Sequence, residues 1–253
     1  MDSLIKTKKI IAIIQARMGS TRTPGKTMTE IAGHPLLYYS VNRVRMSSLI
    51  SSVIVATTTE KKDDFIVSWC EQEKILYSRG SEKNVLDRYY QTAQKYSPDY
   101  VVRITSDCPF SDPDVIDRVI RDTISSHADY GATNIYHHTW PHGLDVEVIK
   151  YDVLVRAWES AINPYDQEHV TPYIRNHPEL FKLVESSLDQ NYSIYRLTVD
   201  YPEDLELTKE LIENYHADML KWQDIIQILR KNPYLFQINK KRIEPQFLTE
   251  TYI

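Results

Sequence analysis

Short aliphatic runs alternate with amphipathic stretches along the first half of the chain. Four runs rich in β-branched residues predict buried strands, the last of them weakly: Lys9–Ile14, Ser52–Ala56, Tyr100–Ile104 and Ile75–Tyr77. Between these runs, apolar residues recur every three or four positions over Val85–Tyr96 and again after Asp112, which is the spacing of one helix face. This alternation predicts an α/β fold with a Rossmann-like, mostly parallel sheet and helices on both faces.

The pattern changes after residue 130, where aromatic and loop-forming residues become common. Residues 134–142 are aromatic and loop-like, and Asp145–Ile149 alternates like a half-exposed strand. Further along, the patterns predict a strand at Ser193–Val199 and helices at Tyr151–Ile162, at Glu168–Asn176, after Asp200 and at Leu220–Arg230. We therefore interpret residues 1–253 as a single domain in which residues 134–192 elaborate the sheet.

Composition narrows the class of protein. The 253 residues include 30 Lys and Arg and 35 Asp and Glu, so the net charge is −5, which argues against general nucleic-acid binding. The apolar run Ile10–Ile14 is far shorter than a membrane span, and Met1–Lys9 lacks the pattern of a secretory signal. Cys70 and Cys108 make neither a disulfide framework nor a zinc site. We expect a cytoplasmic globular protein that binds no membrane.

The loop after the first predicted strand has an unusual composition. Residues 15–26 read QARMGSTRTPGK and hold two of the six glycines. No Asp or Glu occurs between Ser3 and Thr29, although the whole chain has 35, and the same stretch is rich in Lys and Arg. Open α/β sheets bind anionic ligands at the carboxyl ends of their strands. We expect this loop to hold phosphate through backbone N–H groups, the Ser20 and Thr21 hydroxyls and its cations.

A P-loop of the nucleoside triphosphatases is the obvious alternative, because the loop ends in Gly25-Lys26-Thr27. That motif requires four residues between its two glycines, whereas five separate Gly19 from Gly25 here. One of the five is Pro24, which has no N–H to offer a phosphate. The spacing therefore argues against a P-loop.

The loop resembles the opening motif of the cytidylyltransferases that make CMP-activated sugar acids. The resemblance is greatest to the spore-coat-polysaccharide type, and the chain is also similar to CMP-Kdo and CMP-sialic acid synthetases. Further matches follow in order along the chain: SRGSEKNVLDRY at 78–89, RITSDCPF at 103–110, GLDVEV at 143–148, EHVTPYI at 168–174 and LTVDYPEDLEL at 197–207. The resemblance implies a fold like that of the nucleotide-diphospho-sugar transferases and transfer of CMP from CTP to a sugar or sugar acid, with release of pyrophosphate, for surface polysaccharide biosynthesis.

The resemblance also implies roles for particular residues. Arg17, Arg22 and Lys26 would line the triphosphate and serve catalysis, while Asp107 and Asp200, each placed after a predicted strand, would hold Mg²⁺. Taken singly, Asp107 also fits a turn and Asp200 a helix N-cap. The nucleotide-binding positions implied are Gln15, Ala16, Gly19, Ser20, Ala56, Thr57, Arg79 and Ser106.

The acceptor side of the site is expected in the second half of the chain. Asp145 and Glu147 lie on one predicted strand, and we interpret them as opposite-facing carboxylates that contact the sugar or a metal. His169 is a third candidate substrate contact. The surplus of Tyr, Trp and His between residues 134 and 191 predicts a homodimer, because related synthetases pair through such a segment.

Two other functions remain open at this point. A metal-dependent glycosyltransferase of similar fold usually has an Asp-x-Asp pair, but Cys108-Pro109 follows Asp107 here. A non-catalytic nucleotide-binding homologue would not need to keep the charged residues of both motifs. Pyrophosphate release from CTP and a sugar acid distinguishes the transferase from both alternatives.

Overall fold

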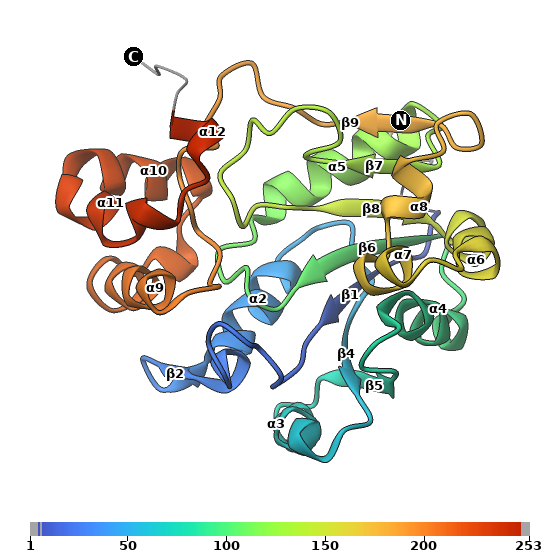
Figure 1. Ribbon diagram of the computed structural model, residues 1–253, viewed down its shortest axis with the longest axis horizontal. Helices are drawn as coiled ribbons and strands as arrows, with labels where there is room; N and C mark the ends of the chain where they lie inside the picture. Colours follow the sequence, from blue (N-terminus) through green and yellow to red (C-terminus); the bar gives the residue numbers. More distant parts are fainter. Residues whose placement is uncertain (1–4, 6, 249–253) are drawn as a thin grey trace.

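The computed structural model describes residues 5 and 7–248 and is built around one central sheet (Figure 1). The seven strands lie in the order β5-β4-β1-β6-β8-β7-β9. Their bounds are β1 (Ile10–Gln15), β4 (Ser52–Thr58), β5 (Leu76–Gly80), β6 (Tyr100–Thr105), β7 (Tyr130–Ala132), β8 (Glu147–Lys150) and β9 (Leu183–Glu185). A separate short hairpin joins β2 (Glu30–Ile31) to β3 (His34–Pro35).

The direction of the strands explains where a ligand can bind. Strands β5, β4, β1 and β6 are parallel, whereas β8 runs antiparallel to both β6 and β7. The chain leaves β1 toward β4 and β5 and then crosses back to β6 on the other side of β1, so the strand order reverses between β1 and β6. Loops diverge at such a reversal and leave a crevice at the carboxyl ends of the two strands.

Helices cover both faces of the sheet, as predicted (Figure 1). One hydrophobic core packs against α2 (Leu36–Arg45), α3 (Asp64–Gln72), α5 (Pro113–Ser125), α9 (Pro202–Tyr215) and α10 (Trp222–Lys231). The core on the other face packs against α4 (Val85–Tyr96), α6 (Tyr151–Ser160) and α8 (Pro172–Arg175). The remaining α-helices are short: α7 (Pro164–His169), α11 (Pro233–Asn239) and α12 (Pro245–Leu248).

Most local predictions are confirmed. Strands β1, β4 and β6 coincide with the predicted aliphatic runs, and α4 has the predicted bounds. Helix α5 begins at Pro113 with Asp112 as its N-cap, whose carboxylate accepts from the backbone N–H of Asp114 at 2.9 Å. The weak strand candidate at residues 75–77 is also real, but it extends to Gly80.

Two elements of the second half were predicted wrongly. The helix expected at Glu168–Asn176 is broken, because α7 ends at His169, Val170 has a φ of 73° and α8 restarts at Pro172. Proline has no N–H for a helix interior and its ring clashes with the preceding turn. The strand expected at Ser193–Val199 is an irregular segment with one bridge, between His142 and Arg196, because its neighbour is a loop that offers no continuous ladder.

Among the described residues, 5 and 7–248, no helix has the length and apolar character needed to cross a lipid bilayer.

Candidate active site

The basic loop after β1 is folded tightly against the end of the sheet. The Ala16 N–H donates to the Ala56 carbonyl at 3.1 Å, and the Met18 N–H donates to the Asp63 carboxylate at 2.6 Å. Gly25 adopts a φ of 73°, a conformation that favours glycine, and the short helix η1 (Lys26–Met28) begins directly after it. This turn points Lys26 back toward the sheet, where its side chain is buried.

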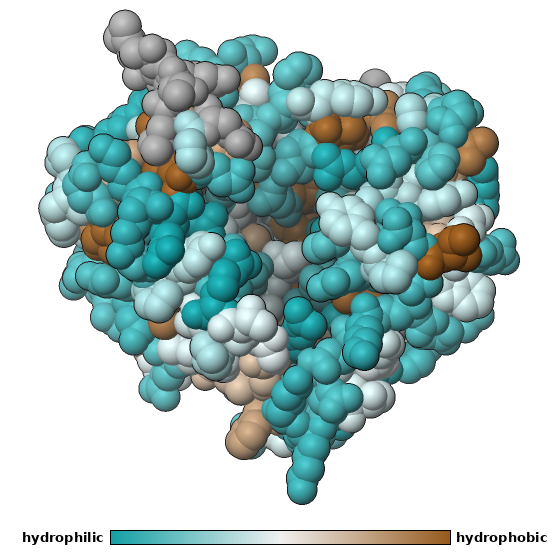
Figure 2. Space-filling model, viewed as in Figure 1, coloured by the Kyte–Doolittle hydropathy of each residue, from teal (hydrophilic) through white to brown (hydrophobic). Residues whose placement is uncertain are grey.

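A cavity of about 230 Å³ opens where the strand order reverses. Gln15 at the end of β1 and Thr105 at the end of β6 are register partners, and both line the cavity. Figure 2 shows the surface hollowed near the centre of the view, with mostly hydrophilic side chains around it. The lining combines five cationic side chains with three acidic ones: Arg17, Arg22, Lys26, Arg88 and Arg103, and Asp107, Glu168 and Asp200. This surplus of positive charge suits an anionic ligand.

Lys26 joins two carboxylates from distant parts of the chain. Its Nζ lies 2.8 Å from Asp107 Oδ2 and 3.1 Å from Asp200 Oδ1, and it also donates to the Val199 carbonyl at 2.5 Å. Burial alone would lower the pKa of Lys26, but the two carboxylates outweigh burial and raise this pKa above its ordinary value. The predicted catalytic cation and the predicted metal ligands therefore meet at one point.

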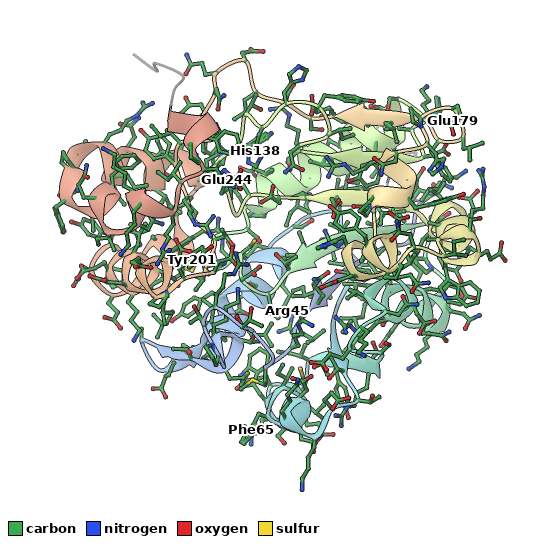
Figure 3. The ribbon with its side chains drawn as sticks, viewed as in Figure 1. Arg45, Phe65, His138, Glu179, Tyr201 and Glu244 are labelled. Carbon is green, nitrogen blue, oxygen red and sulfur yellow. The ribbon has the colours of Figure 1, made fainter. Side chains whose placement is uncertain are left out.

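Asp200 is held by two further cations. Arg22 Nη2 lies 2.8 Å from Asp200 Oδ1, and Arg196 Nη2 lies 2.8 Å from Asp200 Oδ2. Burial would raise the pKa of Asp200, but Lys26, Arg22 and Arg196 together lower it below its ordinary value. The Tyr201 ring, labelled in Figure 3, lies beneath the Arg22 guanidinium with 5.0 Å from Cζ to the ring centroid. Asp200 is therefore ionised and fixed in place.

The position of Asp200 does not depend on a strand. The Val199 N–H donates to the Asp107 carbonyl at 2.8 Å, which brings Asp200 beside Asp107 even though Ser193–Val199 is irregular. Asp200 is not a helix cap either. Tyr201 is the N-cap of α9, and the Asp204 carboxylate accepts from the N–H groups of Asp200 and Tyr201 at 3.0 Å.

The chemistry of the donors limits which metal the pair can hold. Mg²⁺ takes six oxygens, commonly one or two carboxylates with the rest from phosphates and water. Within residues 5 and 7–248 there is no group of three or more His, Cys, Asp or Glu that could hold a metal by itself. Asp107 and Asp200 therefore fit Mg²⁺ only when a ligand supplies phosphate oxygens to the shell.

A family model for cytidylyltransferases matches residues 11–233. This chain belongs to the cytidylyltransferase family. It is 34% identical to the spore coat polysaccharide biosynthesis protein SpsF of Bacillus subtilis over 88% of this chain and 95% of that protein. A solved cytidylyltransferase structure from Leptospira borgpetersenii has a TM-score of 0.86 and 29% identity, and the match covers 97% of this chain and 99% of that one. A 3-deoxy-manno-octulosonate cytidylyltransferase of Brucella ovis is 31% identical over 46% of this chain and 47% of that protein.

Most of the site residues predicted from the sequence line the cavity of this cytidylyltransferase. Ten of the predicted site residues line it: Gln15, Ala16, Arg17, Ser20, Arg22, Lys26, Ser106, Asp107, His169 and Asp200. They come from the end of β1 and the loop after it, the loop after β6, the end of α7 and the segment just before α9. The two halves of the chain thus contribute to one site.

Four of the predicted nucleotide positions lie outside the lining. Ala56 and Thr57 are inside β4 and fully buried, so neither side chain reaches the cavity. Arg79 lies within β5, and it donates to the Thr58 carbonyl at 2.8 Å and pairs with a carboxylate at the start of α3. Gly19 packs beside Lys62 and Glu82. Because β5 extends to Gly80, past the predicted end at Tyr77, Arg79 belongs to the strand and not to the loop after it.

Asp145 and Glu147 do not face opposite sides of one strand, as was expected from the sequence. Residues two apart on a strand share a face, so that expectation was wrong. Asp145 precedes β8 and accepts from Asn134 Nδ2 at 2.7 Å and from the Gly143 N–H at 3.1 Å. Burial raises its pKa, and repulsion from Glu147 adds to that rise. Neither carboxylate lines the cavity.

Glu147 instead forms the centre of a buried network. Its carboxylate pairs with Arg103 Nη1 and accepts from the hydroxyls of Tyr130 and Thr171, each at 2.6 Å. Burial would raise the pKa of Glu147, but Arg103 and the two hydroxyl donors lower it below its ordinary value. Glu147 therefore does not reach the cavity itself, but it holds and neutralises Arg103, which does line the cavity.

Two charged lining residues had no role assigned from the sequence: Arg88 and Arg103. The sequence nevertheless held a signal for both. Arg88 follows Val85 by three residues and so lies on the apolar face of the predicted helix, and Arg103 interrupts a run of aliphatic residues in β6. A charged residue in a buried position usually has a specific partner, so both arginines could have been selected on that ground.

Proposed function

We propose that this cytidylyltransferase moves CMP from CTP to a hydroxyl of an ulosonic or nonulosonic sugar acid and releases pyrophosphate, as a step in surface polysaccharide synthesis. The contact that carries this proposal is Lys26 Nζ bridging Asp107 and Asp200 beside a cationic loop. Such a reaction forms one bond from the acceptor oxygen to the α-phosphorus and breaks the bond from the α-phosphorus to the oxygen that bridges it to the β-phosphorus. The acceptor hydroxyl loses its proton to water, and the β- and γ-phosphates leave as pyrophosphate. The reaction needs in-line positioning and neutralised phosphate charge more than covalent help.

Different residues would bind the phosphates, neutralise the reacting phosphate and hold the metal. Arg17 and Arg22 are exposed and face the cavity, so both can meet phosphate oxygens, Arg22 by exchanging its contact with Asp200 for one with phosphate. Lys26 is held beside the two carboxylates, so its charge lies close to the place where the reacting phosphate would bind. Asp107 and Asp200 would hold Mg²⁺ together with the phosphates, and the ion would supply charge neutralisation for the departing pyrophosphate.

A sugar acid as acceptor is supported by the relatives and by the charge of the cavity. The Brucella ovis relative is named for activating 3-deoxy-manno-octulosonate, and SpsF is named for polysaccharide synthesis. The five cationic side chains of the lining also favour an acceptor that carries a negative charge over a neutral one.

We further propose a homodimer that pairs through residues 134–192. Large apolar side chains are exposed in this segment, including Tyr136, Ile162 and Tyr165 at 66%, 89% and 59%. A second chain that covered these side chains would remove their apolar surface from water, which favours pairing. Gel filtration at micromolar concentration is expected to give the mass of two chains, and a monomer would contradict the proposal.

A pyrophosphate-release screen tests the proposed reaction. Four nucleoside triphosphates are combined with a panel of ulosonic and nonulosonic acids in the presence of Mg²⁺, and we expect release only with CTP and one acid or a small group of acids. Asp107→Asn should lower kcat by about 10²-fold or more, whereas Asp152→Asn, at an exposed position, should not change it. A full rate for Asp107→Asn contradicts the metal assignment. Absence of pyrophosphate with every acid contradicts the function.

A further inference from the structure

A second group of side chains lines the same cavity from α4, β6 and α7. Val85 and Arg88 come from α4, Arg103 and Thr105 from β6, and His169 from α7. All of these positions lie on the face of the sheet that α4 and α6 cover, since the alternate β6 residue Val101 belongs to the same core. This group is separate in sequence from the loop that carries Arg17, Arg22 and Lys26.

Within residues 5 and 7–248, Arg88 is a buried cation that has no carboxylate partner. Its residue exposure is 2%, and none of the ion pairs within the described part of the chain includes it. Its Nη1 donates to the Ser81 carbonyl at 2.6 Å, but its Nε has no hydrogen-bond partner among these residues. Burial lowers the pKa of Arg88, because the charge is removed from water without full compensation. An unpaired buried charge destabilises a fold unless a ligand neutralises it.

Arg103 offers a second unused donor. Glu147 already neutralises its charge, yet its buried Nε also has no partner among the described residues. The side-chain oxygen Oε1 of Gln15, which also lines the cavity, is likewise buried and has no hydrogen-bond partner among the described residues. Buried polar atoms are almost always paired, so several unpaired atoms around one cavity indicate that a polar ligand completes them.

We propose that Arg88, assisted by Arg103 Nε, binds the carboxylate of the acceptor sugar acid. The inference rests on the proposed function and deepens it by naming the group that selects acids over neutral sugars. A planar guanidinium matches a carboxylate in shape and charge, and the pair is strong when water is excluded. The phosphates of CTP already have Arg17, Arg22 and Lys26, so the uncompensated charge of Arg88 is available to the acceptor.

The test compares the acid and the neutral carboxamide of the acceptor with the highest rate in the pyrophosphate screen. We expect Arg88→Met to raise the KM for the acid roughly 10- to 100-fold, as for loss of a charged hydrogen bond. The KM for CTP should change less than about threefold, and the preference of the wild-type enzyme for acid over carboxamide should disappear. The KM of Arg88→Lys for the acid should lie between those of the wild type and Arg88→Met, because lysine keeps the charge but lacks the paired N–H donors of a guanidinium.

A matched control separates this role from a structural one. Arg43 is also buried, at 3% exposure, but it belongs to α2 and pairs with Asp112. Arg43→Met should lower the unfolding midpoint and leave both KM values unchanged, whereas Arg88→Met should leave the midpoint no lower than that of the wild type, because it removes an unpaired charge.

The outcomes distinguish the two proposals. If the wild-type enzyme turns over but Arg88→Met keeps its preference for the acid, the role of Arg88 is wrong and the proposed function stands. If Arg88→Met raises the KM for CTP as much as the KM for the acid, Arg88 binds the nucleotide and the inference is overturned. If the wild-type enzyme releases no pyrophosphate with any acid while calorimetry shows it folded and binding CTP, the proposed function has failed and the inference falls with it.

Discussion

Replacing Lys26 with methionine is expected to lower kcat by about 10²- to 10³-fold, the effect of removing one preorganised charge from a transition state. Among the residues that the structure describes, Lys26 is the one whose side chain pairs with both Asp107 and Asp200, and this side chain is only 10% exposed. Methionine fills a similar volume but leaves the two carboxylates without the cation between them. Steady-state kinetics with CTP and the preferred acceptor measure the effect.

Two further variants make the Lys26 result interpretable. Lys95→Met changes an exposed lysine on α4 and should keep the wild-type rate. Lys26→Arg keeps the charge but displaces it, and should recover part of the activity. If Lys26→Met is folded by circular dichroism and turns over within about threefold of the wild type, the cation between the two acids is not catalytic.

The second large effect concerns stability. Glu147→Gln is expected to lower the free energy of unfolding by about 3–5 kcal/mol at pH 7, since it leaves the mostly buried Arg103 as an uncompensated charge. Glutamine can keep Oε1 as the acceptor for the Tyr130 and Thr171 hydroxyls, but its NH2 group replaces the oxygen that accepts from Arg103, so the change removes the ion pair and leaves the other two hydrogen bonds in place. Urea unfolding followed by fluorescence measures the difference.

The pH dependence follows from the lowered pKa of Glu147. Its stabilising contribution is complete above the unfolded-state pKa of about 4.3 and is lost as the pH falls through the lower pKa of the folded state. The difference between wild type and Glu147→Gln should therefore be constant near neutral pH and shrink below about pH 4. The double variant Arg103→Met with Glu147→Gln should recover much of the lost stability. A difference that persists unchanged at pH 3 would show that Glu147 stabilises the fold by packing rather than by charge.

Elements determined by local pattern could be predicted from the sequence. The aliphatic runs became β1, β4 and β6, and the periodic stretch after Asn84 became α4, since each pattern matches the burial of a strand or of one helix face. The loop after β1 was also predictable, because its glycines, missing acids and clustered cations are all visible within a dozen residues. These predictions required no knowledge of long-range contacts.

Features that depend on distant neighbours could not be predicted in the same way. Residues 193–199 have the composition of a strand, but the segment beside them is a loop and permits only the bridge from His142 to Arg196. Glu147 is an acid in an alternating strand, and only the tertiary structure shows that Arg103, Tyr130 and Thr171 surround it. The resemblance implies that Ala56 and Thr57 bind the nucleotide, yet both lie inside β4, fully buried and outside the cavity lining.

A crystal structure of the protein with CTP and Mg²⁺ bound provides the most direct measurement. The triphosphate should lie against the loop from Arg17 to Lys26, and a magnesium ion should take oxygen ligands from Asp107 and Asp200 at about 2.0–2.1 Å. Density for the nucleotide at another part of the surface, with Arg22 and Lys26 still paired to Asp200 and no ion between the two acids, would contradict this assignment.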